Sequence, residues 1–364
     1  MPRLEAPLAD IERVRQPSIQ DVARRARVSW KTVSNVLHQR AIVRPETRGR
    51  VEAAIAELNY RPSLAGRQLR MGRTHLLALA LPEISQPYFA ELAHAMIEAA
   101  AGSGYTLLID ETMGRADQER VVAEGFEVRL IDGIVFNPLG MTGAEISARR
   151  DRTPIVLLGE HITSVETGVD HITIDNVVSA HEATMHLIRS GRKRIAFLGY
   201  QSWRTHGTGD LRLRGFQQAL LAAQLPFDRG LVIEADAFTR EEGEARAIQL
   251  LPRIREIDAL VCASDLLAVG ALRALLRARV AVPDEIALLG WDGTPEAAFS
   301  HPSLTTIAPD KDTIARVAVH TLLRRIDGDR SPPATHVVPH RLIVRESTAP
   351  ARGRAPEPAN HRIG

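Results

Sequence analysis

The chain has 364 residues, 45% of them hydrophobic and 25% charged, which is the composition of a globular protein with room for more than one domain. Its one cysteine, Cys262, excludes a disulfide framework and indicates a reducing, cytoplasmic location. No stretch approaches the roughly 18 consecutive apolar residues of a membrane span, and the charged N-terminus lacks the apolar run of a signal peptide. We therefore expect no membrane association.

Positive charge is concentrated at the start of the chain. Residues 1–73 hold 15 lysines and arginines against 7 acids, whereas the remainder holds 31 against 37. A basic segment of this kind favours contact with a polyanion, because neutralising phosphates releases counterions. Charge alone is equally compatible with a solvated basic surface.

Three short helical patterns follow one another in this basic segment. Ser18 can cap a first helix that ends near Arg27, and after a tight turn Ser29 can cap a second. A third helix begins at Pro45 and ends before Pro62. Helices this short form a core only when packed together, which predicts a helix-turn-helix unit that lays its second helix in the major groove of DNA.

Three ordered motifs span these helices. They are SIQDVARRARVSWKTVSNVL at 18–37, VRPETR at 43–48 and LNYRP at 58–62. Together they resemble the DNA-binding head of the LacI/GalR (lactose-repressor) family, and similar motifs continue to about Ser347. The resemblance implies a sequence-specific transcriptional regulator, in particular a repressor, that binds a palindromic double-stranded DNA operator as a homodimer under the control of a small-molecule effector.

The same resemblance assigns DNA contacts to the second helix. The side chains implied to read base edges are Trp30, Lys31 and Asn35. Those implied to hold phosphates and fix the register are Ser29, Thr32 and Ser34. The alternative for Trp30 is that it packs on the first helix. Arg27 differs from the family, which usually has a turn glycine at that position.

Residues 63–73 form a hinge segment and linker in which 63–70 resemble the family's hinge helix, which orders on the operator and inserts a leucine, here Leu69, into the minor groove. An isolated helix of this length is well below the ~12–15 residues needed for marginal stability in water, so a partner must fold it. The alternative is a plain linker, but a linker has no need of Leu64 and Leu69. We expect disorder in the arm at 1–16 and in the tail at 351–364, which has no heptads to form a tetramer.

From Thr74 the pattern changes to apolar runs that alternate with amphipathic segments. Strands are expected at 76–81, 105–109, 133–136 and 155–158 in one lobe, and at 194–198, 231–234, 259–263 and 286–289 in another. Helices are expected at 88–101, 178–190, 214–223, 241–254 and 266–278.

The predicted fold is therefore an all-α helix-turn-helix domain at 17–62 and an α/β body at 74–350, similar to periplasmic binding proteins, with two doubly wound parallel-sheet lobes. Lobe 1 covers about 74–174 and 306–337, and lobe 2 covers about 175–305 and 338–350. Ligands bind beyond the carboxyl ends of such strands, so we expect the effector in a cleft between the lobes.

The resemblance also implies which residues line that cleft. Arg212 would grip ligand oxygens with its guanidinium fork, and Asp292 would accept ligand hydroxyls. The other implied effector contacts are Gln86, Tyr88, Phe89, Thr208, Phe238, Ser264 and Trp291. An arginine, an acid and aromatic faces favour a sugar or sugar derivative. The alternatives are that Asp292 caps a turn, Arg212 pairs with Asp210 and Trp291 belongs to the lobe core.

Catalytic and metal-binding motifs do not occur in the sequence. It contains no phosphate loop, no nucleophile elbow and no dinucleotide fingerprint after the first strand, so we expect neither an enzyme nor a cofactor. His181 and His186 are five residues apart, whereas a helical metal site needs four, and no metal is expected. The competing interpretation is a soluble sugar-binding or sugar-processing protein whose basic N-terminus is incidental.

Overall fold

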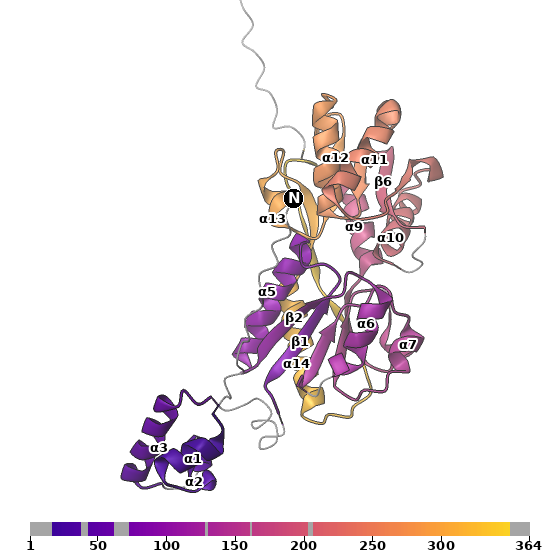
Figure 1. Ribbon diagram of the computed structural model, residues 1–364. Coiled ribbons are helices and arrows are strands. Elements are labelled where there is room, and N and C mark those ends of the chain that lie inside the picture. Colours follow the sequence, from indigo (N-terminus) through magenta and orange to yellow (C-terminus); the bar gives the residue numbers. More distant parts are fainter. Residues whose placement is uncertain are drawn as a thin grey trace, which may run out of the picture. The chain divides into compact units, whose positions relative to one another are not determined.

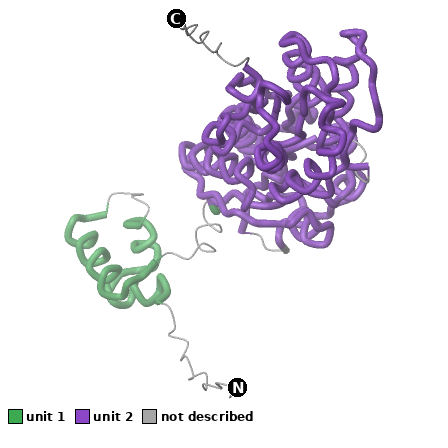
Figure 2. The backbone as a smooth tube through the Cα atoms, turned by 90° about the horizontal axis from the view of Figure 1, so that it is seen from above, with its two compact units in different colours: residues 1–74 green, residues 75–364 purple. Residues whose placement is uncertain are grey.

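The computed structural model describes residues 17–37, 43–61, 73–127, 130–160, 162–202 and 207–349. The chain divides into two compact units, Met1–Thr74 and His75–Gly364 (Figure 2). The expected N-terminal arm, the C-terminal tail and the hinge residues 63–72, Leu69 among them, lie outside the described residues.

The first unit contains the three expected helices: α1 (Ile19–Ala26), α2 (Trp30–Leu37) and α3 (Pro45–Glu57). Ser18 caps α1 as predicted, because its Oγ accepts from the Asp21 amide while the Asp21 carboxylate accepts from the Ser18 amide at 2.9 Å. Arg27 ends α1 with φ 56° and ψ 48°, a left-handed conformation that costs an arginine more than a glycine. The small core of the unit consists of Val22, Ala23, Ala26, Val33, Val36, Val51, Ala54 and Tyr60.

The second unit contains two six-stranded sheets, one in each lobe. The first has the order β11-β5-β4-β3-β1-β2 and the second the order β12-β10-β9-β8-β6-β7. The strands of the first are β1 (Leu76–Leu81), β2 (Thr106–Glu111), β3 (Gly133–Phe136), β4 (Ile155–Leu158), β5 (Asp170–Ile174) and β11 (Thr335–Val338). Those of the second are β6 (Ile195–Tyr200), β7 (Val232–Glu234), β8 (Ala259–Cys262), β9 (Ala287–Trp291), β10 (Thr305–Pro309) and β12 (His340–Ile343).

Helices cover both faces of each sheet. In lobe 1 these are α5 (Pro87–Gly102), α6 (Ala116–Ala123), α7 (Gly143–Ser147), α8 (Ser164–Thr167) and α14 (Lys311–Ile326). In lobe 2 they are α9 (Asn176–Arg189), α10 (Thr208–Ala222), α11 (Arg240–Leu250), α12 (Asp265–Arg277) and α13 (Pro295–Phe299). Helix α9 packs along α10 and α11 along α12, while α14 packs beside α5 although more than 200 residues separate them in sequence (Figure 1).

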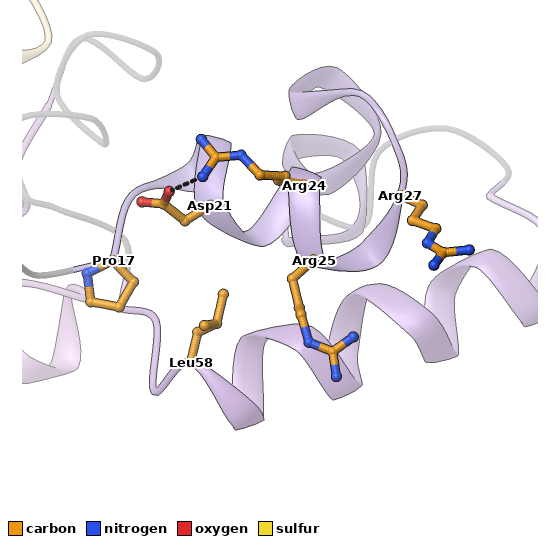
Figure 3. Close-up of a pocket in the computed structure, with 6 residues that line it drawn as sticks. All are labelled: Pro17, Asp21, Arg24, Arg25, Arg27 and Leu58. Carbon is orange, nitrogen blue, oxygen red and sulfur yellow. Dashed lines mark ion pairs between the residues drawn. The ribbon is translucent and has the colours of Figure 1, made fainter.

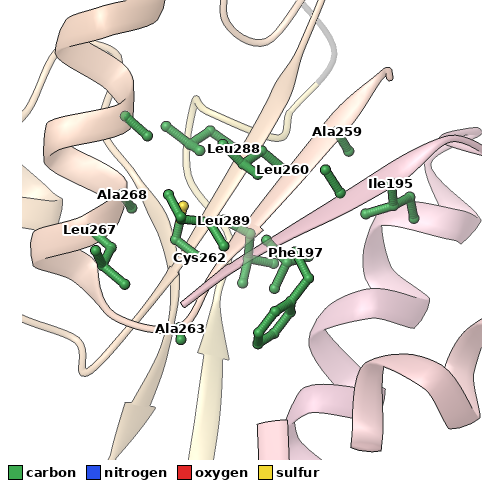
Figure 4. Close-up of a cluster of buried hydrophobic side chains, with 14 of the residues drawn as sticks. Ile195, Phe197, Ala259, Leu260, Cys262, Ala263, Leu267, Ala268, Leu288 and Leu289 are labelled. Atoms are coloured by element: carbon green, nitrogen blue, oxygen red, sulfur yellow. The ribbon is translucent and has the colours of Figure 1, made fainter. Parts of the chain in front are cut away.

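Strand β1 shows why these sheets are buried on both faces. Alternate side chains point to opposite faces, so Leu77, Leu79 and Leu81 join the core beneath α5 and α14 while Ala78 and Ala80 join the cluster on the other face. In lobe 2, Phe197, Leu260 and Leu289 from neighbouring strands and Leu267 of α12 belong to one buried apolar cluster (Figure 4).

All eight expected strands are present within about three residues, but the lobe boundaries differ from expectation. Strand β10 lies in the second sheet, so the chain returns to lobe 1 after Pro309 and not at 306. Strand β12 runs antiparallel to β10, so the second sheet is not wholly parallel. The four unexpected strands, β5, β10, β11 and β12, mix polar with apolar residues, and the single residue between β11 and β12, Pro339, gives no loop that hydrophobic runs could reveal.

Candidate DNA-binding and effector-binding sites

Helix α2 presents its polar residues away from the core of the first unit. Ser29 caps the helix as predicted, with its Oγ accepting from the Thr32 amide at 3.2 Å. Val33 and Val36 are buried, while Lys31 is exposed and Trp30 is 57% exposed. Because a core tryptophan would be buried, this exposure argues against packing of Trp30 on α1.

The remaining implied DNA contacts lie on the same short helix. Ser29 is exposed, and Thr32, Ser34 and Asn35 are partly exposed. The structure therefore brings together, on one eight-residue helix and its cap, the six residues that the sequence assigned to DNA.

A groove between α1 and the end of α3 adds positive charge to this unit (Figure 3). It has a volume of about 610 Å³ and is lined by Pro17, Asp21, Arg24, Arg25, Arg27 and Leu58. Arg24 pairs with Asp21 at 3.3 Å and Arg25 with Glu57 at 2.7 Å. Arginines beside the first helix suit phosphate contacts, since that helix crosses the DNA backbone in helix-turn-helix complexes.

The second unit contains a cleft of about 570 Å³ lined by both lobes. Lobe 1 contributes Pro82, Glu83, Gln86, Tyr88, Phe89, Glu111, Met113, Asn137, Leu139, Gly159, Glu160 and Ile174. Lobe 2 contributes Gln201, Thr208, Arg212, Asp236, Ala237, Phe238, Asp292 and Pro309. Most of them follow the carboxyl ends of strands, where ligands bind in sheets of this kind.

Arg212 is buried in the floor of the cleft, with 4% of its surface exposed. Its Nε donates to Asn176 Oδ1 at 2.7 Å, its Nη1 donates to the Ala263 carbonyl, and its guanidinium lies 4.2 Å from the ring centre of Trp291. Burial lowers the pKa of Arg212, and the nearby carboxylate of Asp292 opposes that shift. The alternative of an Arg212–Asp210 pair is wrong, because Asp210 pairs with Arg214 at 2.8 Å.

Asp292 faces Arg212, with 3.9 Å between Oδ1 and Nη1. Its backbone has φ 108°, a conformation unusual for any residue but glycine, and its amide donates to the Ile307 carbonyl at 2.8 Å. Burial raises the pKa of Asp292 to about 7, and Arg212 opposes this rise. Asp292 is thus a strained, desolvated acid at the cleft and not a simple turn cap.

A second buried carboxylate, Asp265, lies near Asp292. It accepts from the Thr294 amide at 2.7 Å, from the Thr294 hydroxyl at 3.0 Å and from the Thr306 hydroxyl at 2.7 Å. Burial raises the pKa of Asp265 to about 6 despite these donors. Asp265 therefore links α12 to the segment that follows β9 and to β10 itself, and it helps to position Asp292.

Tyr88 and Phe89 begin α5 and form an edge-to-face pair with ring centres 5.3 Å apart. The ammonium of Lys311 lies 5.5 Å from the Tyr88 ring, donates to the Asp292 carbonyl at 2.7 Å and pairs with Glu91 at 2.7 Å. Burial raises the pKa of the Tyr88 phenol above its usual range. Aromatic faces from lobe 1 thus stand opposite the charged pair from lobe 2.

Seven of the nine expected effector residues line the cleft, and two do not. Trp291 is fully buried in the lobe 2 core and supports Arg212 from behind. Ser264 is buried and caps α12, its Oγ accepting from the Leu267 amide at 3.1 Å. We correct both assignments, because a side chain without a surface on the cleft cannot contact a ligand there.

Several cleft residues were missed from the sequence. Asn137 follows β3, Glu160 follows β4 and Asp236 follows β7. Their position just beyond a strand's carboxyl end was the available signal. Asn176 and Lys311, which support Arg212 and Asp292, also follow strand ends, but the strands β5 and β10 that precede them were not predicted, so this signal could not be used.

Comparison with known proteins agrees with this arrangement. Residues 18–63 match the family model for bacterial regulatory proteins of the lacI family, and residues 184–348 match the periplasmic binding protein-like domain. The HTH-type transcriptional regulator CelR of Thermobifida fusca is 33% identical over 349 residues, covering 93% of this chain and 100% of CelR. The chain belongs to the LacI family.

Another LacI-family relative is the HTH-type transcriptional repressor CytR of Escherichia coli K12, which is 31% identical and covers 91% of this chain and 96% of its own. Among solved structures, a CelR–cellobiose complex has a TM-score of 0.67 at 28% identity and covers 91% of this chain and 99% of its own. The Lac repressor dimer bound to operator and an anti-inducer has a TM-score of 0.79 and coverages of 91% and 99%, but at 24% identity it shows the fold alone.

Family membership makes this chain a transcriptional regulator with a helix-turn-helix head and a two-lobed body, as predicted. It removes the alternative in which the basic N-terminus is incidental. Within the described part of the chain, no helix is long and apolar enough to cross a membrane, and no three histidine, cysteine, aspartate or glutamate side chains gather as a metal site.

Proposed function

We propose that this LacI-family regulator is a homodimeric repressor of a near-palindromic operator, controlled by a sugar or sugar derivative bound between its lobes. The observation that carries the effector assignment is the buried Arg212–Asp292 pair in a cleft lined by both lobes. The relatives are transcriptional regulators, which supports a protein that catalyses no reaction and acts on DNA in the cytoplasm.

The chemistry of the cleft supports a polyhydroxylated effector. Arg212 and Asp292 offer fixed donors and acceptors for hydroxyls, and Gln86 and Thr208 offer further polar groups. Tyr88, Phe89 and Phe238 provide flat apolar faces for the C–H surfaces of a sugar ring. The solved complex of CelR with cellobiose shows a relative with a sugar bound.

In the operator complex, we assign base reading to Trp30, Lys31 and Asn35, and phosphate contacts to Ser29, Thr32 and Ser34. The exposure of Trp30 at the start of α2 supports this assignment. Leu69 is proposed as the minor-groove wedge by its place in the hinge motif; it lies outside the described residues.

Exposed apolar side chains on lobe 1 support dimerisation. Leu108 and Ile109 of the edge strand β2 are more than 40% exposed, as are Ile97 of α5 and Val121 of α6. An edge strand with exposed apolar residues is an aggregation hazard unless a partner covers it. A two-fold pair of these surfaces would also present two heads to two half-sites.

A thermal-shift screen followed by an operator gel shift tests the proposal. The purified protein is screened against sugars, sugar acids and nucleobases, since a ligand that binds the native state raises its melting temperature. Hits are then added to the protein and a duplex from its own gene neighbourhood. We expect a salt-sensitive, specific shift that a sugar hit changes; a specific shift that responds to a nucleobase and to no sugar contradicts the effector class.

A further inference from the structure

The cleft wall carries a large excess of negative groups. Among its described lining residues, five are carboxylates, namely Glu83, Glu111, Glu160, Asp236 and Asp292. Arg212 is the one lysine or arginine among them. A cleft lined by one sign of charge concentrates ligands of the opposite sign and repels those of the same sign.

Two of these carboxylates form ion pairs, and the hydrogen-bond donors to the other three are neutral groups. Asp292 faces Arg212, and Asp236 pairs with Arg246 at 3.2 Å. Glu111, in contrast, accepts from the backbone amide of Ile84 at 3.1 Å. Glu83 and Glu160 likewise accept from neutral side chains, so their charges are satisfied by hydrogen bonds without being neutralised.

The positions of Glu83 and Glu160 matter most, because each stands at a helix N-terminus that opens on the cleft. Such ends attract anions through free amides and the helix dipole. At α5, Glu83 accepts from Gln86 Nε2 at 2.9 Å and from Ser85 Oγ at 2.7 Å. At α10, Glu160 of lobe 1 accepts from the hydroxyl of Thr208 in lobe 2 at 3.1 Å. The protein's own carboxylates thus stand at both places where an anionic ligand would bind.

Arg212 does not neutralise the negative charge of the cleft. Its Nε donates to Asn176, its Nη1 donates to Ala263, and the carboxylates of Asp292 and Glu160 oppose its charge. A ligand phosphate or carboxylate that reached it would displace none of the surrounding acids. Hydroxyl groups, in contrast, donate to carboxylates and accept from a guanidinium, so both the acids of the cleft and Arg212 can form hydrogen bonds with them.

We propose that this cleft selects an effector without negative charge, an uncharged or amino sugar, and that Glu83 and Glu160 are the residues that exclude sugar phosphates and sugar acids. The proposal rests on the proposed function of the cleft as the effector site and narrows its ligand class.

The rates at which charged reagents modify a thiol in the cleft measure this charge selectivity directly. Met113 lines the cleft and is 62% exposed, so Met113→Cys introduces a reactive site there. Leu221→Cys is the matched control, because Leu221 is 79% exposed on α10 and does not line the cleft. The native Cys262 is fully buried, so we expect it not to react with the reagents.

The full-length variants are treated with methanethiosulfonate reagents that carry either an ethylammonium or an ethylsulfonate group. We expect the cation-to-anion rate ratio in the cleft to exceed that at the control site by about tenfold at low salt. Adding Glu83→Gln and Glu160→Gln together should bring the ratio most of the way to the control value. A ratio equal to the control, or one that the double substitution leaves unchanged, overturns the proposal.

A comparison of neutral, cationic and anionic sugars completes the test. Glucose, glucosamine, gluconate and glucose 6-phosphate, and the corresponding cellobiose series, are compared by thermal shift. A sugar acid or phosphate that raises the melting temperature more than its neutral parent contradicts the proposal. Neither measurement uses DNA, so a failure here leaves operator control by some other effector standing, and a failure of operator binding leaves the charge selectivity standing.

Discussion

Arg212 is held in one orientation before any effector arrives. Asn176, Ala263 and the Trp291 ring fix its guanidinium on three sides, so an effector loses little of its binding free energy to ordering this side chain. Arg212 lines the cleft, with its Nη1 3.9 Å from Asp292 Oδ1. A preorganised donor of this kind confers specificity as well as affinity.

Replacing Arg212 with alanine should abolish the effector response while leaving operator affinity nearly unchanged. Charged hydrogen bonds are worth roughly 1.5–3 kcal/mol each, so effector affinity should fall at least ~10-fold. Arg212→Lys is the matched variant, since it keeps the charge but loses the fork. An electrophoretic titration of the operator complex with effector checks both; an unchanged midpoint in the alanine variant rules out Arg212 as the anchor.

Asp292 makes the stability of the body depend on pH. Its folded pKa is raised to about 7, whereas an unfolded aspartate titrates near ~4. A raised folded pKa stabilises the native state below the unfolded pKa, and that contribution is lost as pH rises through the folded value. Asp292→Asn cannot titrate, so the wild type should lose stability relative to this variant between pH 4 and 7, by at most ~1.4 kcal/mol per pH unit.

Thermal unfolding of both proteins between pH 5 and 8 measures this effect. The melting temperature of the wild type should fall relative to that of Asp292→Asn as the pH rises, and the difference between the two should become constant above about pH 7. Curves that stay parallel over the whole range would show that Asp292 is ionised in the native protein at every pH tested.

At the residue scale, sequence motifs located the cleft but not its supports. Arg212, Asp292 and Tyr88 could be predicted because each belongs to a motif that resembles the family's. Trp291 and Ser264 share motifs with cleft residues, yet strand alternation and capping turn them inward. The left-handed φ of Asp292 and its contact with Lys311 depend on tertiary packing, which no local pattern encodes.

At the scale of elements, two glycines determine how closely α11 and α12 pack. A Cβ added at Gly270 would lie 2.0 Å from the Arg240 carbonyl oxygen, and one at Gly243 would lie 2.3 Å from that of Leu267. Both distances are far below van der Waals contact, and the obstacle is backbone, which cannot turn away. Close backbone approach therefore requires glycine at both positions.

Gly270→Ala should destabilise the body by about 1–3 kcal/mol or more, because the two helices must move apart. Gly102→Ala is the control in the same unit, since an added Cβ at the end of α5 meets nothing within 4 Å. It should be neutral or slightly stabilising. Chemical denaturation of both variants provides the comparison; equal midpoints for Gly270→Ala and wild type would refute the close-packing account.

Element boundaries could be predicted where apolar runs are pure and not where they are mixed. Strands β1, β3 and β4 are almost wholly apolar, and their bounds were predicted to the residue. Strand β5 contains Asp170, which an ion pair with Arg325 of α14 at 2.6 Å accommodates. Helix α10 begins six residues before its predicted start, because Gly207 and Thr208 read locally as a loop.

At the scale of the whole molecule, the chain combines a small DNA-binding unit with a large body that holds the cleft. Coupling between effector and operator in such regulators has a typical size of 1–3 kcal/mol. The cleft can contribute to it because Lys311 joins the Asp292 carbonyl to Glu91 of α5, and so links lobe 2 to lobe 1. Closure of the two lobes around an effector would act directly on these Lys311 contacts.

Binding of the full-length chain to duplex DNA at graded salt tests the central claim most directly. Fluorescence anisotropy with a duplex from its own gene neighbourhood should show specific binding. The logarithm of its association constant should fall linearly with the logarithm of the salt concentration. Trp30→Ala should weaken specific binding by about 1–3 kcal/mol and leave nonspecific binding nearly unchanged. Failure to bind duplexes of any sequence at low ionic strength would contradict the account.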